Sequence, residues 1–293
     1  MRRRFAEYFP IGFCILFSVA FAGPRVEAAE TLQQGTRQAW ETYEKFTEKR
    51  IFDKELNDKS RFLRLDFMNA SDARKARDVL KSGKVYVQKM MTLDEKGGEI
   101  PVTDGLIHHW YGAIVIPSMN VETLVRWIQD YNSTSKYFKE VKESKLLPRR
   151  DGDNADTFRI YFRLTRTKVL TMSYNTWHTV IYRHHGVGQT SSRSFTTKIA
   201  ELSEAGTPSE RELPEGDDSG FLWRLVSYWR FKQEGNGVVV ECESISLSRG
   251  IPATVGFLNV LSFGTIRRVI ESLPRESLES TLTAMRDGVP KSK

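Results

Sequence analysis

The segment from Ile114 to Leu147 constrains the fold most, because it predicts a strand, a helix and a second strand in close succession. A β-branched run ends at Pro117, and Asn120 follows where its side-chain oxygen can accept a hydrogen bond from the first helical turn. The apolar residues that come next recur at steps of three and four, on one helical face: Val121, Leu124, Ile128 and Tyr131. We therefore expect a short helix that begins at Asn120 and ends near Asn132, followed by a return to strand.

The rest of the chain divides into two helical ends and a β-rich middle. From Lys84 the apolar period changes to two, which is typical of strands. The strands expected there cover residues 84–93, 106–116, 157–164, 169–184, 193–202, 221–232 and 238–249. An additional short strand is expected over Arg61–Met68. Helices are expected over residues 30–50, 72–82, 253–272 and 275–287, with a kink or break at Pro274 because proline removes a backbone donor.

This order of elements resembles the START-like, helix-grip superfamily of polyketide cyclases, coenzyme Q-binding proteins and lipid-transfer domains. The resemblance rests on the strand, Pro117 turn, helix and strand described above, and it covers about Lys84 to Gly288. It implies an α+β fold in which an antiparallel sheet of about six to seven strands wraps around a C-terminal helix. The expected domains are residues 29–83 as an N-terminal helical extension, 84–288 as the START-like domain and 289–293 as a polar tail.

Residues 1–28 have the pattern of a signal peptide. Arg2–Arg4 are followed by an apolar stretch, Ile11–Ala22, which is too short to span a bilayer. Two pairs of residues, Ala20 with Ala22 and Val26 with Ala28, have the spacing of a cleavage site. We therefore expect an exported protein, periplasmic or secreted. Cleavage after Ala28 would lower the net charge from +7 to +5 and leave Cys242 without a partner for an internal disulfide. No basic motif interleaved with aromatic residues indicates a nucleic-acid partner.

The segment Phe221–Arg249 predicts a hairpin that turns at Gly235-Asn236. That turn sets Arg230 opposite Glu241 and Trp229 opposite Cys242. One face then carries large rings beside small residues: Trp223, Trp229, Phe231, Cys242 and Ser244. Because burying a large ring contributes roughly 1.5–3 kcal/mol, more than a cross-strand ion pair, we expect this face to point inward. It forms either the wall of an apolar pocket or a core filled by Leu278 and Leu282 of the C-terminal helix; the resemblance favours the pocket.

Catalytic and metal-binding patterns are weak in this sequence. Adjacent histidines such as His108-His109 point to opposite faces of a strand, so we predict no metal site, and we predict no cofactor. Glu243 is the one candidate for an acid–base residue, but its arginine neighbours favour a structural role. Cys242 has no base placed near it and is expected to fill space. The apolar segment Ala253–Ile270 is either a lid, with possible transient membrane contact, or ordinary core.

We therefore expect a binding protein for a hydrophobic small molecule or lipid. The expected ligand-binding residues are Trp223, Trp229, Phe231, Trp110, Phe162 and Ser244. Two alternatives stay open. One is a cyclase or dehydratase that uses Glu243 or a histidine in the same pocket, and the other is an envelope interaction module with a filled core. The sequence does not specify the oligomeric state.

Overall fold

The computed structural model describes residues 25–167, 171–214, 217–249 and 260–290. Its centre is one antiparallel sheet with the strand order β1-β2-β9-β8-β6-β5-β4-β3, and the short β7 pairs with β6. The strands are β1 (Tyr86–Lys89), β2 (Gly105–Pro117), β3 (Val141–Leu147), β4 (Thr157–Thr167), β5 (Thr171–Gly186), β6 (Gln189–Ser203), β7 (Arg211–Glu212), β8 (Arg224–Glu234) and β9 (Gly237–Arg249). The expected α+β class is confirmed, and the described residues form nine strands where about six to seven were expected.

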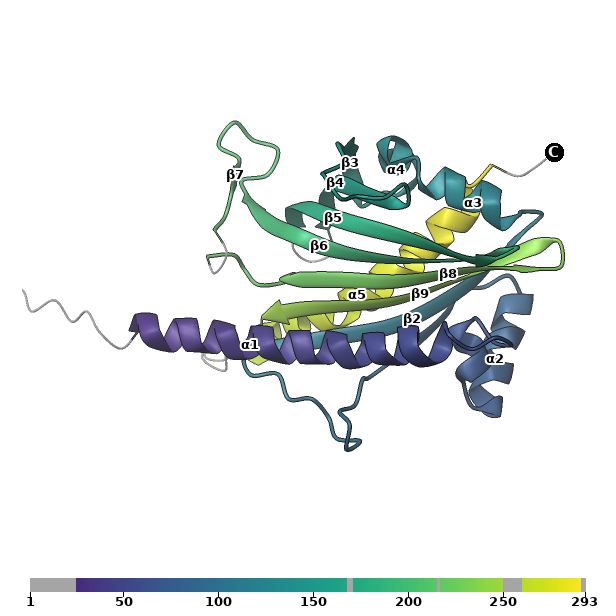
Figure 1. Ribbon diagram of the computed structural model, residues 1–293. Coiled ribbons are helices and arrows are strands. Elements are labelled where there is room, and N and C mark those ends of the chain that lie inside the picture. Colours follow the sequence, from purple (N-terminus) through teal and green to yellow (C-terminus); the bar gives the residue numbers. More distant parts are fainter. Residues whose placement is uncertain (1–24, 168–170, 215–216, 250–259, 291–293) are drawn as a thin grey trace, which may run out of the picture.

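The helices lie on both faces of this sheet. In Figure 1, α1 (Arg25–Glu48, purple) runs along one face, and α5 (Val260–Gly288, yellow) crosses the other. A π-helical turn η1 (Lys49–Glu55), a 3-10 turn η2 (Arg64–Phe67) and α2 (Ala70–Lys81) continue the N-terminal layer. Between β2 and β3 come α3 (Val121–Ile128), η3 (Tyr131–Ser133) and α4 (Thr134–Tyr137). The face with α5 is called the inner face below, and the face with α1 is called the outer face.

The helix after Pro117 begins where its sequence predicts and ends at Ile128, four residues before the expected end near Asn132. The Oδ1 atom of Asn120 accepts a hydrogen bond from the backbone N–H of Thr123 at 2.8 Å. A cluster of buried apolar residues that contains Ile114, Phe231 and Leu282 is called the main core cluster. Val121 and Leu124 belong to it, so the apolar stripe faces the sheet. Tyr131 is also buried there, although it belongs to the separate turn η3.

The β8–β9 hairpin has the predicted turn and register. Arg230 pairs with Glu241, and Trp229 pairs with Cys242. Gly235 has φ +59°, the left-handed conformation that glycine adopts without a steric penalty. From Leu225 to Phe231 the odd-numbered residues of β8 face inward, because the same register holds along the whole strand pair.

Two local predictions are wrong. Residues 61–68 do not form a strand, because Arg64–Phe67 are a 3-10 turn in which the Asp66 carboxylate accepts from the backbone N–H of Leu63 at 3.1 Å. Leu63 and Leu65 are both buried, so the turn reproduces the alternation of a strand. The C-terminal helix does not split at Pro274 but continues through it. The first part of the expected helix, residues 253–259, lies outside the described residues.

The packing of α5 continues one residue past the end of the helix at Gly288. Val289 is buried in the main core cluster, and its backbone N–H bonds to the Met285 carbonyl at 3.2 Å, so it extends the packing of α5.

The position of α5 is set by close contact with β2. A Cβ atom on Gly112 would lie 2.7 Å from Leu282 Cδ1 and 3.0 Å from Leu278 Cδ2. Leu282 is fully buried, so relieving this contact would require the core around it to repack. The missing side chain at Gly112 therefore lets α5 pack directly on the β2 end of the sheet and away from β4–β6.

Replacing Gly112 with valine should push α5 off β2. Valine is the better strand former, yet we expect Gly112→Val to lower the free energy of unfolding by about 1–3 kcal/mol through overpacking. Urea unfolding monitored by far-UV circular dichroism measures this. Gly35→Ala, where a Cβ meets nothing within 4 Å, is the control and should leave stability unchanged or raise it slightly. Equal stability of Gly112→Val and the native protein would contradict the assigned packing.

Candidate functional site

A cavity of about 370 Å³ lies between α5 and the inner face of the sheet. Its sheet wall comes from β4, β5, β6, β8 and β9, and its opposite wall comes from residues 273–285 of α5. Ile128, Tyr131 and Phe138, from the segment between β2 and β3, also line it. The cavity exists because α5 packs against β2 and the curled strands β4–β6 stand away from it.

Aromatic and aliphatic side chains form most of this lining. Trp229 and Phe231 of β8 stack with ring centroids 6.3 Å apart and planes 4° apart. Phe162 of β4 lines the cavity from another strand, and α5 contributes Leu278 and Met285. The structure thus places three of the expected aromatic residues in one cavity wall, together with Ser244.

Trp223 and Trp110 are not placed in the cavity as expected. Trp223 precedes β8, which begins at Arg224, and it packs on the outer face in a cluster with Trp40 and Tyr43. The alternation of β8 therefore does not extend back to it. Trp110 lies on β2 opposite Ser244, where it packs against the core cluster that contains Leu278, and it does not line the cavity.

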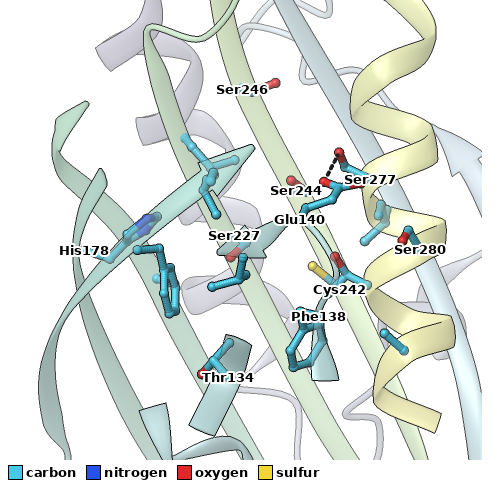
Figure 2. Close-up of a pocket in the computed structure, with 18 of the residues that line it drawn as sticks. Thr134, Phe138, Glu140, His178, Ser227, Cys242, Ser244, Ser246, Ser277 and Ser280 are labelled. Atoms are coloured by element: carbon cyan, nitrogen blue, oxygen red, sulfur yellow. Dashed lines mark hydrogen bonds between the residues drawn. The ribbon is translucent and has the colours of Figure 1, made fainter. Parts of the chain in front are cut away.

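Polar groups also reach the cavity. His178 of β5 is buried, and its Nε2 lies 2.9 Å from Thr176 Oγ1. Burial lowers the pKa of His178 to about 4, so the imidazole is neutral at pH 7. Burial and the nearby Glu243 raise the pKa of Cys242, which leaves a neutral thiol in the wall. Figure 2 shows the side chains of His178 and Cys242 facing the cavity, with Ser227 and Ser244 between His178 and α5.

A polar cluster joins β4 to α5 at the rim of the cavity. Arg166 donates to the carboxylate of Glu140 at 3.0 Å and to that of Glu276 at 3.2 Å, and it also contacts Ser277. Ser277 donates to Glu140 at 3.1 Å, the bond drawn in Figure 2. Because Glu140, Arg166 and Glu276 are partly exposed, they form the solvent side of the site.

Glu243 lies on the outer face, away from the cavity, which corrects its assignment as an acid or base in the pocket. Its Oε1 is 2.8 Å from His109 Nε2, and Arg50 forms an ion pair with it. Burial alone would raise the pKa of Glu243, but Arg50 and His109 outweigh it and hold the pKa below the usual glutamate value. His109 is therefore a partner of this carboxylate and does not line the cavity mouth. His108 faces inward, 2.9 Å from Ser248 Oγ, and does not line the cavity either.

The N-terminal layer covers the charged side chains on the outer face of the sheet. No pattern along the sequence predicts this contact. Arg230 donates to Glu55 of η1 at 2.5 Å, and both side chains are almost fully buried. Glu241 accepts from Tyr111 at 2.5 Å and from the backbone N–H groups of Arg64 and Leu65. These bonds join residues more than 120 positions apart, so the sheet is buried on both faces where β2, β9 and β8 meet the N-terminal helices.

Metal binding and membrane insertion would each need a specific pattern in the described part of the chain. No group of three or more His, Cys, Asp or Glu side chains there is arranged to hold a metal ion. No helix there is long and apolar enough to cross a membrane.

Comparison with known proteins gives matches in structure only. No family model matches the sequence, and no curated protein matches it. A STAR-related lipid transfer protein from Xanthomonas axonopodis aligns at 14% identity with a TM-score of 0.41, covering 69% of this chain and 98% of that one. A START superfamily protein from Mycobacterium smegmatis aligns at 9% identity, with a TM-score of 0.39 and coverages of 62% and 97%. The Zhui aromatase/cyclase from Streptomyces sp. R1128 aligns at 8% identity, with a TM-score of 0.41 and coverages of 63% and 94%.

These proteins are of the kind that the sequence resembles.

Neutralising Glu243 should weaken the attachment of the N-terminal layer. We expect Glu243→Gln to lower the free energy of unfolding by about 3 kcal/mol, because it leaves Arg50 without one of its buried charged partners. The pKa of Glu243 is depressed in the folded protein, so its contribution is present above the unfolded pKa near 4.5 and is lost as the pH falls below it. Stability should therefore fall less steeply with acid in the variant than in the native protein.

Urea unfolding between pH 7 and pH 3 measures both effects. Glu95→Gln removes an exposed carboxylate that pairs with Lys49 at 3.3 Å and should change neither quantity. If the free energy of unfolding of Glu243→Gln fell as steeply between pH 7 and pH 3 as that of the native protein, the assigned direction of the Glu243 pKa would be contradicted.

Proposed function

We propose that this protein binds a hydrophobic small molecule or lipid in the cavity between α5 and the sheet. The observation that carries the proposal is the unfilled volume of about 370 Å³, lined largely by apolar side chains. Ligand pockets of proteins have volumes of about 300–1,000 Å³ and similar linings with a few polar groups. In the empty cavity these apolar side chains would face water, which is unfavourable. A bound apolar molecule would remove that surface from water.

The two alternatives receive less support. A cyclase or dehydratase that uses Glu243 is disfavoured, because that carboxylate is buried on the other side of the sheet against Arg50 and His109. An interaction module with a filled core is disfavoured, because Leu278 and Leu282 of α5 pack toward Gly112 and leave the space over β4–β6 open.

We also propose that the protein acts outside the cytoplasm. The support is the sequence pattern of residues 1–28, in which arginines precede a short apolar stretch and small residues. Intact-mass analysis after expression in a host with a general secretory pathway tests this. We expect an exported chain that begins at Ala29, and Leu16→Arg, which interrupts the apolar stretch, should block export. Recovery of the uncleaved chain in the cytoplasm alone would overturn the proposal.

Filling the cavity should abolish ligand uptake. Ala284 of α5 lines the cavity, and Ala284→Phe would place a ring in it. We expect the uncharged fluorophore N-phenyl-1-naphthylamine to bind the native protein and to bind Ala284→Phe at least tenfold more weakly. Fluorescence titration gives both dissociation constants, and circular dichroism checks that each variant is folded.

The matched control is Ala70→Phe, at an exposed position of α2. It adds the same ring far from the cavity and should leave the affinity unchanged. Equal affinity of folded Ala284→Phe and the native protein would show that the fluorophore binds elsewhere, and no binding to the native protein would count against the proposed function itself.

A further inference from the structure

Three serines form a straight row across the sheet wall of the cavity. Ser194 of β6 pairs in register with Ser227 of β8, and Ser227 pairs with Ser244 of β9. All three line the cavity. Neighbouring strands lie ~4.8 Å apart, so the row presents three hydroxyl groups at that interval. Figure 2 shows Ser227 and Ser244 side by side on this wall, facing the space beside α5.

The hydroxyls of this row have hydrogen-bonding capacity that the protein does not use. Ser227 Oγ accepts from Trp229 Nε1 at 3.1 Å, so its own proton remains available for donation. Ser194 and Ser244 make no side-chain hydrogen bond within the part of the chain that the structure describes. The three side chains are half-buried, and hydroxyls in a cavity wall are available to pair with water or with a ligand. A wall with a packing role alone would be served by alanine or valine at these three positions.

The charges around the cavity separate this row from a site for an anion. The cations among the described lining residues are Lys139 and Arg166. Lys139 is exposed, and Arg166 is engaged by Glu140, Glu276 and Ser277 at the rim. His178, the one histidine among the described lining residues, is neutral at pH 7. A carboxylate placed at the serine row would therefore be buried without a counter-charge, which is strongly unfavourable.

The opposite wall is mixed. Leu278, Ala284 and Met285 of α5 lie there among Ser277, Ser280 and Thr281, and Trp229 and Phe231 stack beside the row on the sheet wall. A molecule between these walls would meet a row of three hydroxyls on the sheet side, and hydrocarbon with separate hydroxyls on the helix side.

We propose that the cavity binds an uncharged, mostly apolar molecule whose oxygen atoms lie along one side and accept hydrogen bonds from Ser194, Ser227 and Ser244. The inference rests on the proposed function, and it names the class of ligand for that site. It differs from binding of a fatty acid, whose carboxylate would seek Lys139 at the rim, and from binding of a plain hydrocarbon, which would leave the row unpaired.

Three probes of similar shape separate these cases: fluorene, 9-fluorenone and fluorene-9-carboxylate. Each competes with N-phenyl-1-naphthylamine for the native protein in a fluorescence titration. We expect 9-fluorenone, whose carbonyl oxygen can accept from two neighbouring serines, to bind about tenfold more tightly than fluorene. Fluorene-9-carboxylate should bind most weakly at pH 7.

The variant that tests the row is Ser194→Ala/Ser227→Ala/Ser244→Ala. It should lose the preference for 9-fluorenone over fluorene while its affinity for fluorene stays the same or rises. Ser280→Ala removes a hydroxyl from the α5 wall of the same cavity and should keep the preference. Should the triple variant not fold, Ser227→Ala, which removes the hydroxyl common to both neighbouring pairs, should reduce the preference by about two- to threefold.

The outcomes distinguish this inference from the function on which it rests. If the naphthylamine binds but 9-fluorenone has no advantage over fluorene, or if the carboxylate binds best, the assigned ligand class is wrong and the binding function stands. A preference for 9-fluorenone that survives in the folded triple variant would likewise overturn the role of the row. If the naphthylamine does not bind the native protein, the binding function fails first.

Discussion

The contact between α5 and β2 at Gly112 determines where this protein has an interior and where it has a cavity. Leu278 and Leu282 lie so close to the Gly112 backbone that a Cβ atom there would overlap them. The helix is thus held over β2 at one side of the sheet, and the other strands curve away from it. Protein interiors are close-packed, so the volume that remains over β4, β5, β6, β8 and β9 follows from the lateral position of α5. Trp229, Phe231 and the serine row are cavity residues for this reason.

The second organising feature is the buried ionic layer on the outer face. Arg230 pairs with Glu55, Glu243 pairs with Arg50, and Glu241 accepts from the backbone of η2. Buried ion pairs contribute little net stability compared with apolar packing, but removal of one partner is costly. They therefore specify how the N-terminal extension attaches to the sheet. A misplaced extension would leave several of these charges buried and unpaired.

Local signals in the sequence predicted the local structure well. The Asn120 cap and the Gly235-Asn236 turn are read from adjacent residues, and the turn fixes the whole register of β8 and β9. Trp223 shows the limit of this reasoning, because the alternation of a strand holds only within its hydrogen-bonded length. The strand expected over Arg61–Met68 failed for a related reason, since a 3-10 turn can bury alternate leucines as a strand does.

Features that depend on distant residues could not be predicted in this way. Pairing of Glu243 with Arg50 joins positions 193 residues apart, and no pattern along the chain identifies that pair. The same holds for the volume of the cavity, which depends on the contact at Gly112. The sequence showed which residues share a face of β8 and β9, and the placement of the helices showed what each face meets.

The unequal coverage of the sheet has a mechanical consequence. Strands β2 and β9 are held between α5 and the N-terminal helices, whereas β3 is an edge strand that pairs within the sheet with β4 alone and is flanked by the short elements η3 and α4. Deformation of the molecule should therefore concentrate in the β3–β4 flank, where fewer contacts resist it. Under the proposed function, ligands of different widths would then be accommodated by small outward bending of the β3–β4 flank, while β2 and β9 keep their positions.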